Sequence, residues 1–174
     1  MRISRNQKCN RGSERWDIVN IVLCRIDERL AHGQVITSWT RLKEVLRILV
    51  VDDALAKDSF MSEVMEMAAP TGVKVEVRAT EEALAIINEE KGSQNTMLLF
   101  KDLLGAYKLI KSGYHMKELN IGNIGSGPGR KAVTKRVYMS PSEIEMAKEL
   151  SEMGVYVYLQ MVPSDPEVNV LTQI

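Results

Sequence analysis

The feature that most constrains the fold is an alternation of two kinds of segment along the whole chain. Apolar runs of strand length, rich in β-branched residues, alternate with amphipathic segments of helix length. This order is typical of an α/β protein with an open, mainly parallel sheet and helices on both faces. The expected strands are residues 18–26, 47–53, 73–79, 96–102, 118–124, 135–139 and 155–162, and the expected helices are residues 32–45, 56–69, 80–91, 103–113 and 140–154.

Apolar spacing and capping residues predict how three of these helices are built. We expect the sheet-facing side of residues 32–45 to carry Val35, Trp39 and Leu42. In residues 56–69 the corresponding apolar face consists of Phe60, Val64 and Met67. The helix at 140–154 has the clearest signals, which are an N-cap serine, a first-turn proline, a glutamate at N3 and a C-terminal glycine: Ser140, Pro141, Glu143 and Gly154.

Length and composition limit the possible classes of protein. The 174 residues are enough for one domain with its own core. Equal numbers of basic and acidic residues, 23 each, and 5% aromatic residues argue against a nucleic-acid partner. Cys24 lies in an apolar run and is expected to be a buried small hydrophobe. With neither a signal peptide nor an apolar run long enough to cross a membrane, the chain is expected in the cytoplasm.

Three polar clusters follow expected strands, and one of them holds the most reactive chemistry. They are "RIDERLAHG" (25–33), "VVDDALAKD" (50–58) and "NIGNIGSGPGRK" (120–131). Open parallel sheets bind ligands at the carboxyl ends of their strands, so we expect the three clusters to form one site.

His32 is the candidate reactive group of this site. A histidine of this kind is a general base, a metal ligand, a nucleophile or a core residue. A metal is not expected, because the other histidine, His115, lies in an exposed connection and no paired ligand is near. Arg25 and Arg29 favour a nucleophile that carries a phosphoryl group, since guanidinium forks match phosphate oxygens. A solvated loop with ordinary ion pairs is the alternative.

Neighbouring residues are expected to support a phosphoryl group. Gly33 allows close backbone approach, and the amides that follow it, from Gln34 on, add the positive end of a helix dipole. Asp27 is the expected orienter of an arginine or of the imidazole, whereas Glu28 is as well explained as a helix cap. Asp53 is expected beside His32 or as the N-cap of the next helix.

The glycine-rich loop 125–131 is a second candidate for phosphate binding. Ser126 and Arg130 lie in it, and its spacing matches neither a Walker loop nor the dinucleotide fingerprint. Ordinary turn chemistry explains the glycines equally well. Two acids at the end of an expected strand, Asp52 and Asp53, also suggest a receiver-type acidic pocket, but the acceptor aspartate and lysine of such a pocket are not evident.

Several blocks together resemble a known family. "NIVLCRIDERLAHGQV", "VVDDALAKDSFMSEVMEMA", "LNIGN", "GRKAVTKRVYMSPSEIEMAKEL" and "GVYVYLQMVPSD" are similar to the IIB component of the mannose/fructose/sorbose family of the bacterial sugar phosphotransferase system. The resemblance covers residues 19–165, which defines the expected domain. Residues 1–18 are then a polar, basic leader that is expected to be disordered, and 166–174 a C-terminal tail or short turn.

The resemblance implies a phosphocarrier enzyme without a cofactor. His32 would accept a phosphoryl group, through Nδ1, from a phosphohistidine of the IIA component. It would pass that group to a sugar carried through the membrane by the IIC and IID components, with which the protein would associate peripherally. Arg29 would neutralise the phosphoryl oxygens, and Asp27 and Arg25 match the rest of the loop.

The chain departs from the family pattern in two places and leaves some questions open. Ala31 replaces a larger aliphatic residue, and Ile124–Ser126 replaces a pair such as Met-His, which would affect partner choice. An over-extended gene prediction would explain the leader. The sugar remains open among mannose, fructose, sorbose and N-acetylgalactosamine, as does the oligomeric state. A regulatory module or a small-molecule binding domain, without onward transfer, is the alternative function.

Overall fold

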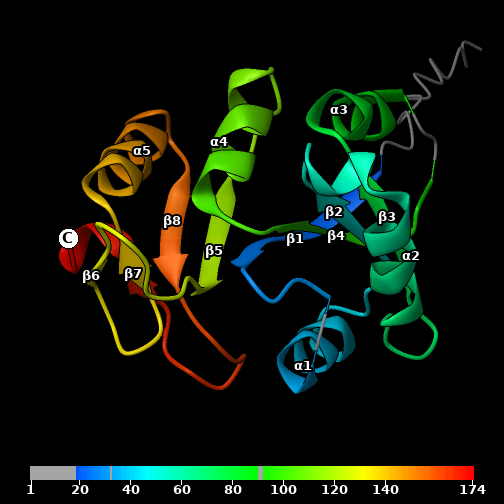
Figure 1. The fold of residues 1–174 in the computed structure, drawn as a ribbon, viewed down its shortest axis with the longest axis horizontal. Coiled ribbons are helices and arrows are strands. Elements are labelled where there is room, and N and C mark those ends of the chain that lie inside the picture. Colours follow the sequence, from blue (N-terminus) through cyan, green and yellow to red (C-terminus); the bar gives the residue numbers. More distant parts are fainter. Residues whose placement is uncertain (1–18, 32, 90–91) are drawn as a thin grey trace, which may run out of the picture.

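The computed structural model describes residues 19–31, 33–89 and 92–174 (Figure 1). The expected leader and His32 therefore lie outside the described residues. In chain order the elements are β1 (Asn20–Asp27), α1 (Gln34–Leu42), β2 (Arg47–Val51), the 3-10 helix η1 (Leu55–Lys57), α2 (Ser59–Met67), β3 (Lys74–Arg78), α3 (Thr80–Glu89), β4 (Asn95–Phe100), α4 (Leu103–Lys111), β5 (Glu118–Asn123), β6 (Lys131–Ala132), β7 (Tyr138–Met139), α5 (Pro141–Glu152), β8 (Tyr156–Leu159), β9 (Val168–Asn169) and η2 (Val170–Thr172).

The centre of the fold is a seven-stranded sheet in the order β3-β2-β4-β1-β5-β8-β9. All neighbouring pairs are parallel except β8 and β9. The predicted open, mainly parallel α/β sheet is therefore confirmed. Strand β8 does not close the sheet as expected, because residues 168–169, which were assigned to a tail, pair with Tyr158 and Leu159 as an antiparallel edge strand.

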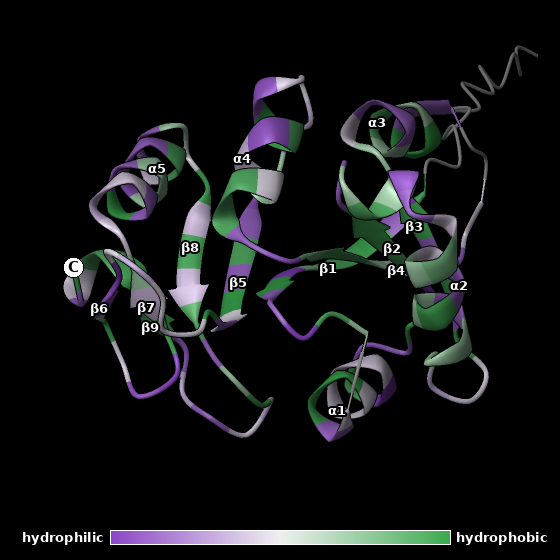
Figure 2. Cartoon of the chain, in the orientation of Figure 1, coloured by the Kyte–Doolittle hydropathy of each residue, from purple (hydrophilic) through white to green (hydrophobic). Residues whose placement is uncertain are grey.

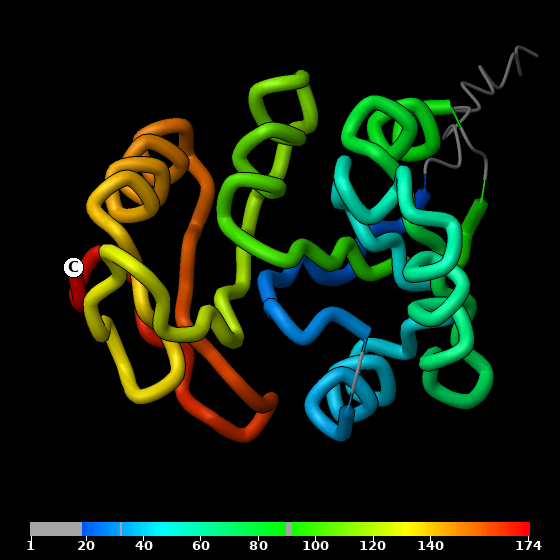
Figure 3. Tube along the Cα trace, in the orientation of Figure 1, coloured from blue at the N-terminus to red at the C-terminus, as the bar shows by residue number. Residues whose placement is uncertain are grey.

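Helices cover both faces of the sheet, which confirms the predicted layering (Figures 1 and 3). One buried cluster joins the sheet to α3, α4 and α5, through side chains such as Ile87, Leu109 and Leu150. A second cluster on the opposite face joins it to α1 and α2, through Ile36, Trp39 and Met65. In the part of the chain that the structure describes, none of these helices is long and apolar enough to cross a bilayer.

The prediction of which helix faces lie inward was partly wrong. Trp39 is buried as expected, but Leu42 in α1 is exposed. In α2 the inward side chain is Met65, whereas Phe60 and Met67 are exposed at 70% and 86%. Apolar spacing marks a hydrophobic stripe, but α2 has methionines on several sides, so packing against the sheet decided which one is buried.

The predicted capping signals of α5 are confirmed. Ser140 accepts a hydrogen bond from the Glu143 amide at 3.3 Å, and Glu143 Oε2 accepts one from the Ser140 amide at 2.8 Å. This reciprocal box satisfies two amides that the helix itself leaves unpaired. Gly154, at φ 90°, follows the C-cap residue Met153.

Candidate functional site

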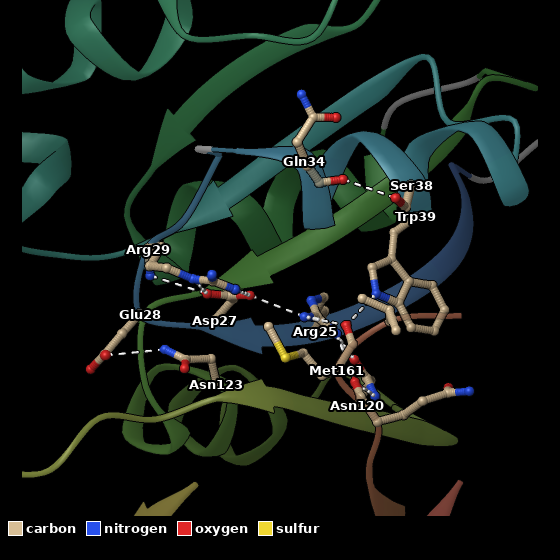
Figure 4. Close-up of polar contacts among 12 residues, drawn as sticks. Arg25, Asp27, Glu28, Arg29, Gln34, Ser38, Trp39, Asn120, Asn123 and Met161 are labelled. Atoms are coloured by element: carbon tan, nitrogen blue, oxygen red, sulfur yellow. Dashed lines mark hydrogen bonds and ion pairs between the residues drawn. The ribbon is translucent and has the colours of Figure 1, made fainter. Parts of the chain in front are cut away.

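The site is built where β1, β5 and β8 end side by side. Strand β1 lies between β4 and β5, and β5 lies between β1 and β8, so the chain segments that leave β1, β5 and β8 emerge at one edge of the sheet. Figure 4 shows the side chains that these segments contribute. Two of the three polar clusters predicted to converge, those after β1 and β5, do meet here.

Arg25, on β1, is completely buried at the centre of the site. Its Nη1 donates to Asn120 on β5 and to the Gln160 carbonyl at 3.0 Å, and its Nη2 donates to the Met161 carbonyl at 3.0 Å. Arg25 Nη2 also forms an ion pair with Asp27 at 3.0 Å. The guanidinium therefore connects three strands, and this burial differs from the expectation that Arg25 contacts phosphate oxygens.

Aromatic packing completes the surroundings of Arg25. The Trp39 ring of α1 lies under the guanidinium, with its centroid 5.3 Å from Arg25 Cζ, and Trp39 Nε1 donates to the Met161 carbonyl at 2.9 Å. Burial lowers the pKa of Arg25 from its ordinary value, and the Asp27 carboxylate opposes that shift. An arginine remains charged in proteins, so Arg25 is a fixed cation with a fixed counter-ion.

Asp27, at the end of β1, orients the next arginine. Its Oδ1 accepts from Arg29 Nε at 2.9 Å and from the Arg29 backbone amide at 3.2 Å, while its Oδ2 accepts from Arg29 Nη2 at 3.0 Å. The Asp27 side chain is 0% exposed and that of Arg29 is 40% exposed. The hydrogen bonds from Asp27 raise the pKa of Arg29. Asp27 thus orients an arginine, one of the two roles predicted for it.

The loop after Asp27 is tightly turned. The Leu30 amide donates to the Asp27 carbonyl at 2.9 Å, and Leu30 has φ 53°. A bulky residue in the left-handed region is strained, and such strain persists where the surroundings hold the chain in place. Leu30 and Ala31 are both buried in the cluster under α1. The backbone is therefore anchored up to the residue before His32.

Helix α1 begins on the other side of His32. Gly33 is the N-cap at φ 89°, a conformation that favours glycine, and it has no side chain to accept from the first amides of the helix. Gln34, the first helical residue, is exposed, and its carbonyl accepts from Ser38 Oγ at 2.9 Å. The first amides of a helix have no partner within the helix, so the start of α1 offers donors of the kind that bind anions.

The segment after β5 packs against the β1 loop. The Glu28 amide donates to the Asn123 carbonyl at 3.2 Å, and Asn123 Nδ2 donates to Glu28 Oε1 at 3.0 Å. A side chain at Gly125 would collide with the Glu28 carboxylate. Glu28 therefore joins the two loops, a role different from the helix cap considered from the sequence.

Arg130 and Ser126 belong to the same segment but differ in their surroundings. Arg130 Nε and Nη2 donate to Glu143 at 3.0 and 2.6 Å, and Nη1 donates to the Gly125 carbonyl at 3.2 Å. The Glu143 carboxylate raises the pKa of Arg130. The guanidinium thus fastens the glycine-rich loop to α5, while Ser126 is exposed.

Asp53 lies in a different place from the one expected. Its Oδ1 accepts from the Thr80 amide at 2.8 Å and from the Thr80 hydroxyl at 2.7 Å, and its Oδ2 pairs with Lys108 at 2.9 Å. These bonds hold the pKa of Asp53 well below its usual range. Strand β4 lies between β2 and β1, which separates Asp53 from the β1 loop. Asp53 therefore connects the start of α3 with the last turn of α4. It does not join the Arg29 cluster, formed by Arg25, Asp27 and Arg29, and α2 is capped by Asp58.

Residues that the sequence did not identify as part of the site complete it. They are Trp39, Asn120, Gly122 and the backbone of Gln160 and Met161. A side chain at Gly122 would overlap the Arg25 guanidinium, so this position requires glycine. Asn120 and Gly122 lie in the "LNIGN" block, and Gln160 and Met161 lie in "VYLQMV", two stretches that carry the family resemblance. Nothing in these stretches of sequence reveals that they contact Arg25. No cluster of three metal-ligating side chains occurs among the residues that the structure describes.

A charged arginine pair on one buried carboxylate, at the carboxyl edge of a parallel sheet, is typical of α/β proteins that handle anionic groups. A family model described as "PTS system sorbose subfamily IIB component" matches residues 21–174. The match thus extends beyond Asp165 to the end of the chain.

Individual relatives agree with the family match. The chain is 36% identical over 157 residues to the sorbose-specific EIIB component of Klebsiella pneumoniae, covering 90% of this chain and 96% of that protein. It is 31% identical to the mannose-specific EIIAB component of Escherichia coli K12, covering 89% of this chain and 48% of that protein. The crystal structure of the IIB domain of the Klebsiella pneumoniae sorbose permease superposes with a TM-score of 0.83 at 34% identity, covering 89% and 96%.

These findings define the protein as a phosphotransferase of the sugar phosphotransferase system, in which it is a phosphocarrier that works with other components. Within that system the chain belongs to the sorbose subfamily of IIB components.

Proposed function

We propose that His32 carries the phosphoryl group, and that the loop described above is built to hold it. The observation that carries this proposal is the Asp27–Arg29 pair, in which a buried carboxylate holds a half-exposed guanidinium by two bonds of 2.9 and 3.0 Å. Arg29 stands three residues before His32, and α1 begins just after it. A cation and a helix start on both sides of one histidine favour an anionic adduct there.

The chemistry is a double displacement at phosphorus. A neutral imidazole nitrogen of His32, Nδ1 by family resemblance, attacks the phosphoryl group of phospho-IIA, and the bond from phosphorus to the IIA histidine breaks as the new P–N bond forms. A sugar hydroxyl oxygen then attacks phosphorus, and the P–N bond to His32 breaks as the O–P bond forms. The hydroxyl proton passes to the released imidazole nitrogen or to solvent, which returns His32 to its free, neutral state. Charge in the transition state lies on the equatorial oxygens, so positioning and electrostatic stabilisation provide the catalysis.

The surrounding residues divide into two roles under this proposal. Arg29 and the amides at Gly33 and Gln34 contact the phosphoryl oxygens. Arg25 and Asp27 are positioning residues, because both are fully buried and act through Arg29. Arg130 supports the neighbouring loop through its pair with Glu143.

The partners follow from the family. We infer that IIA is the donor, IIC and IID hold the sugar, and the protein works at the cytoplasmic side of the membrane. The name of the mannose-specific EIIAB relative supports the partnership with IIA. The names of the relatives include sorbose, mannose, fructose and N-acetylgalactosamine, so these four sugars are the ones to assay.

Labelling by a charged donor tests the proposal. Phosphoenolpyruvate labelled in its phosphoryl group is supplied to the general donor proteins, a matching IIA and either the native chain, His32→Ala or His115→Ala. We expect an acid-labile, base-stable label on the native chain and on His115→Ala, and none on His32→Ala. A label that survives in His32→Ala would move the acceptor elsewhere. If IIA labels a known IIB component but not this chain, the protein is a binding domain without the chemistry. A label that never passes to sugar would instead indicate a regulatory module.

A further inference from the structure

Helix α2 has an apolar stripe that no part of the described fold covers. Phe60 and Met67, two turns apart on the helix, are 70% and 86% exposed, and Val64 lies between them half-buried. Figure 2 shows α2 at the margin of the molecule, and parts of its ribbon have the colour of hydrophobic residues. Large apolar side chains spaced three and four residues apart lie on one side of a helix. When such a group is exposed, it is typical of a docking surface.

Exposed acidic residues lie on α2 and at its N-cap, next to this stripe, and the exposed Lys57 precedes them. Asp58, Glu63 and Glu66 are exposed, and none of them has an ion-pair partner within residues 19–31, 33–89 and 92–174. Elsewhere in the described chain, exposed carboxylates such as Glu145 and Glu149 do pair with lysines. The surface therefore consists of an apolar stripe with an unpaired acidic rim, which we call the α2 stripe: Phe60, Val64 and Met67 with Asp58, Glu63 and Glu66.

The charge of the rim discriminates among the possible occupants. An anionic lipid surface would be repelled by three carboxylates. A second copy of the chain, in a two-fold contact, would bring the same carboxylates against each other, which is also unfavourable. A protein surface that is apolar at its centre and basic at its edge would complement both features.

We propose that the α2 stripe binds the basic cytoplasmic face of the membrane components. Cytoplasmic loops of membrane proteins carry an excess of lysine and arginine, which matches the acidic rim. This inference rests on the proposed partnership with IIC and IID. It assigns docking to a surface whose residues are different from those that hold the phosphoryl group, so that the two functions are separable by mutation.

The packing of α1 and α2 on the sheet keeps the phosphorylation loop (residues 27–34) and the α2 stripe in a fixed arrangement. Both α1, which begins just after His32, and α2 pack on the same face of the sheet, in one buried cluster. A partner that contacts α2 therefore approaches the face of the sheet that α1 also covers. The phosphorylation loop and the α2 stripe stay in a fixed relation, because Ile36 and Met65 belong to the same packed core.

A binding experiment tests the proposal without any phosphoryl chemistry. The native full-length chain and Phe60→Ser/Met67→Ser are titrated against vesicles that contain IIC and IID, and against protein-free vesicles of the same lipids. We expect the double substitution to weaken binding to the IIC/IID vesicles about tenfold or more, as loss of central apolar contacts does. The matched control is Met153→Ser/Leu171→Ser, whose parent side chains are 49% and 44% exposed elsewhere and which we expect to bind like the native chain.

Charge gives a second, independent arm. Glu63→Lys/Glu66→Lys removes the rim's complementarity, so we expect weaker binding and a smaller salt dependence than in the native chain. Equal affinity of the Phe60→Ser/Met67→Ser variant and its control would overturn the proposal. If the native chain binds the protein-free vesicles and Phe60→Ser/Met67→Ser does not, the proposal is overturned in favour of a lipid surface. Concentration-dependent dimerisation abolished by the same variant would overturn it in favour of a second copy.

The same variants separate this inference from the proposed function. In the labelling assay with phospho-IIA, we expect Phe60→Ser/Met67→Ser to be labelled at His32 at the native rate, because its substitutions lie outside the Arg29 cluster. Onward transfer to sugar should need a roughly tenfold higher concentration of the variant. An unlabelled native chain would refute the role of His32 while the vesicle titration still decides the docking surface.

Discussion

The carboxylate of Asp27 holds the guanidinium of Arg29 by two parallel hydrogen bonds, from Nε at 2.9 Å and from Nη2 at 3.0 Å. The same carboxylate pairs with Arg25 at 3.0 Å, so a single buried anion fixes two cations. One of these cations is buried with it and the other extends toward solvent. The pair therefore transmits the rigidity of the sheet to the Arg29 side chain, which is 40% exposed.

The first prediction concerns Asp27. We expect Asp27→Asn to lower the free energy of unfolding by about 3–5 kcal/mol, because it leaves the buried Arg25 without its counter-ion. Urea denaturation followed by circular dichroism measures this loss. Glu145→Gln is the control, since Glu145 pairs with Lys148 at the surface, and it should change stability by less than about 1 kcal/mol. Equal stability of Asp27→Asn and the native chain would show that Arg25 does not need this partner.

The second prediction concerns Arg29 and phosphoryl transfer. We expect Arg29→Ala to slow labelling of the protein by phospho-IIA about tenfold or more, which corresponds to about 1.4 kcal/mol in the activation free energy. Arg29→Lys keeps the charge but loses the two-bond geometry with Asp27, so its rate should fall between those of the native chain and Arg29→Ala. Single-turnover labelling measures all three rates. A native rate in Arg29→Ala would remove Arg29 from the mechanism.

The third prediction uses two glycines that differ in their surroundings. A methyl group at Gly122 would overlap the Arg25 guanidinium, whereas at Gly105, in α4, its closest neighbour would be the Val51 carbonyl at 3.5 Å. We expect Gly122→Ala to displace Arg25, to lower the melting temperature and to slow labelling. Gly105→Ala should be neutral or stabilising by up to about 1 kcal/mol, since alanine favours a helix interior. Thermal unfolding of both variants makes the comparison, and equal melting temperatures would contradict it.

The fourth prediction concerns pH and Asp53. The Thr80 amide, and then Lys108 and the Thr80 hydroxyl, hold the pKa of Asp53 below its value in the unfolded chain. A depressed pKa stabilises the fold at pH values above the unfolded pKa, near about 4, and that contribution is lost as pH falls through the folded pKa. We therefore expect Asp53→Ala to cost about 1 kcal/mol at pH 7, as the loss of a helix cap does.

The pH dependence of the same residue provides the check. Asp53→Asn keeps an acceptor oxygen but not the charge, so the difference in stability between it and the native chain should shrink below about pH 4. Lys108→Met should reduce that pH dependence, because it removes one cause of the shift. Urea midpoints measured from pH 7 down to pH 3 decide the matter. A stability difference that is constant over this range would show that the charge of Asp53 does not contribute.

Much of the architecture was predictable because it depends on local pattern. Within the described residues, the alternation of apolar runs and amphipathic segments located seven of the nine strands and all five α-helices. The capping box of α5 followed from Ser140 and Glu143 alone. Strands β6 and β9 were not predicted. Each has only two residues, and each is defined by its backbone pairing with another strand, β7 and β8 respectively. Their existence depends on what lies beside them, which no short window of sequence contains.

The candidate site was predictable to a different degree in its parts. The loop of Arg25, Asp27 and Arg29 was identified because its residues are close in sequence. The partners of Arg25, namely Asn120 and the Gln160 and Met161 carbonyls, come from 95 to 136 residues away. The inward face of α2 was mistaken for a related reason: the spacing of Phe60, Val64 and Met67 describes a stripe, but not whether the sheet or solvent faces it.

The sequence by itself determined the α/β class, the order of the main elements and the residues proposed to carry the chemistry, because periodicity, capping and side-chain type act over a few residues. Only the tertiary structure decided which of those residues meet. Strand β4 inserts between β2 and β1, and this places Asp53 against the start of α3 and the last turn of α4, while β5 and β8 bring Asn120 and Met161 onto Arg25. The order of the strands in the sheet determines which of these residues meet, because strands that are neighbours in the sheet are distant along the chain.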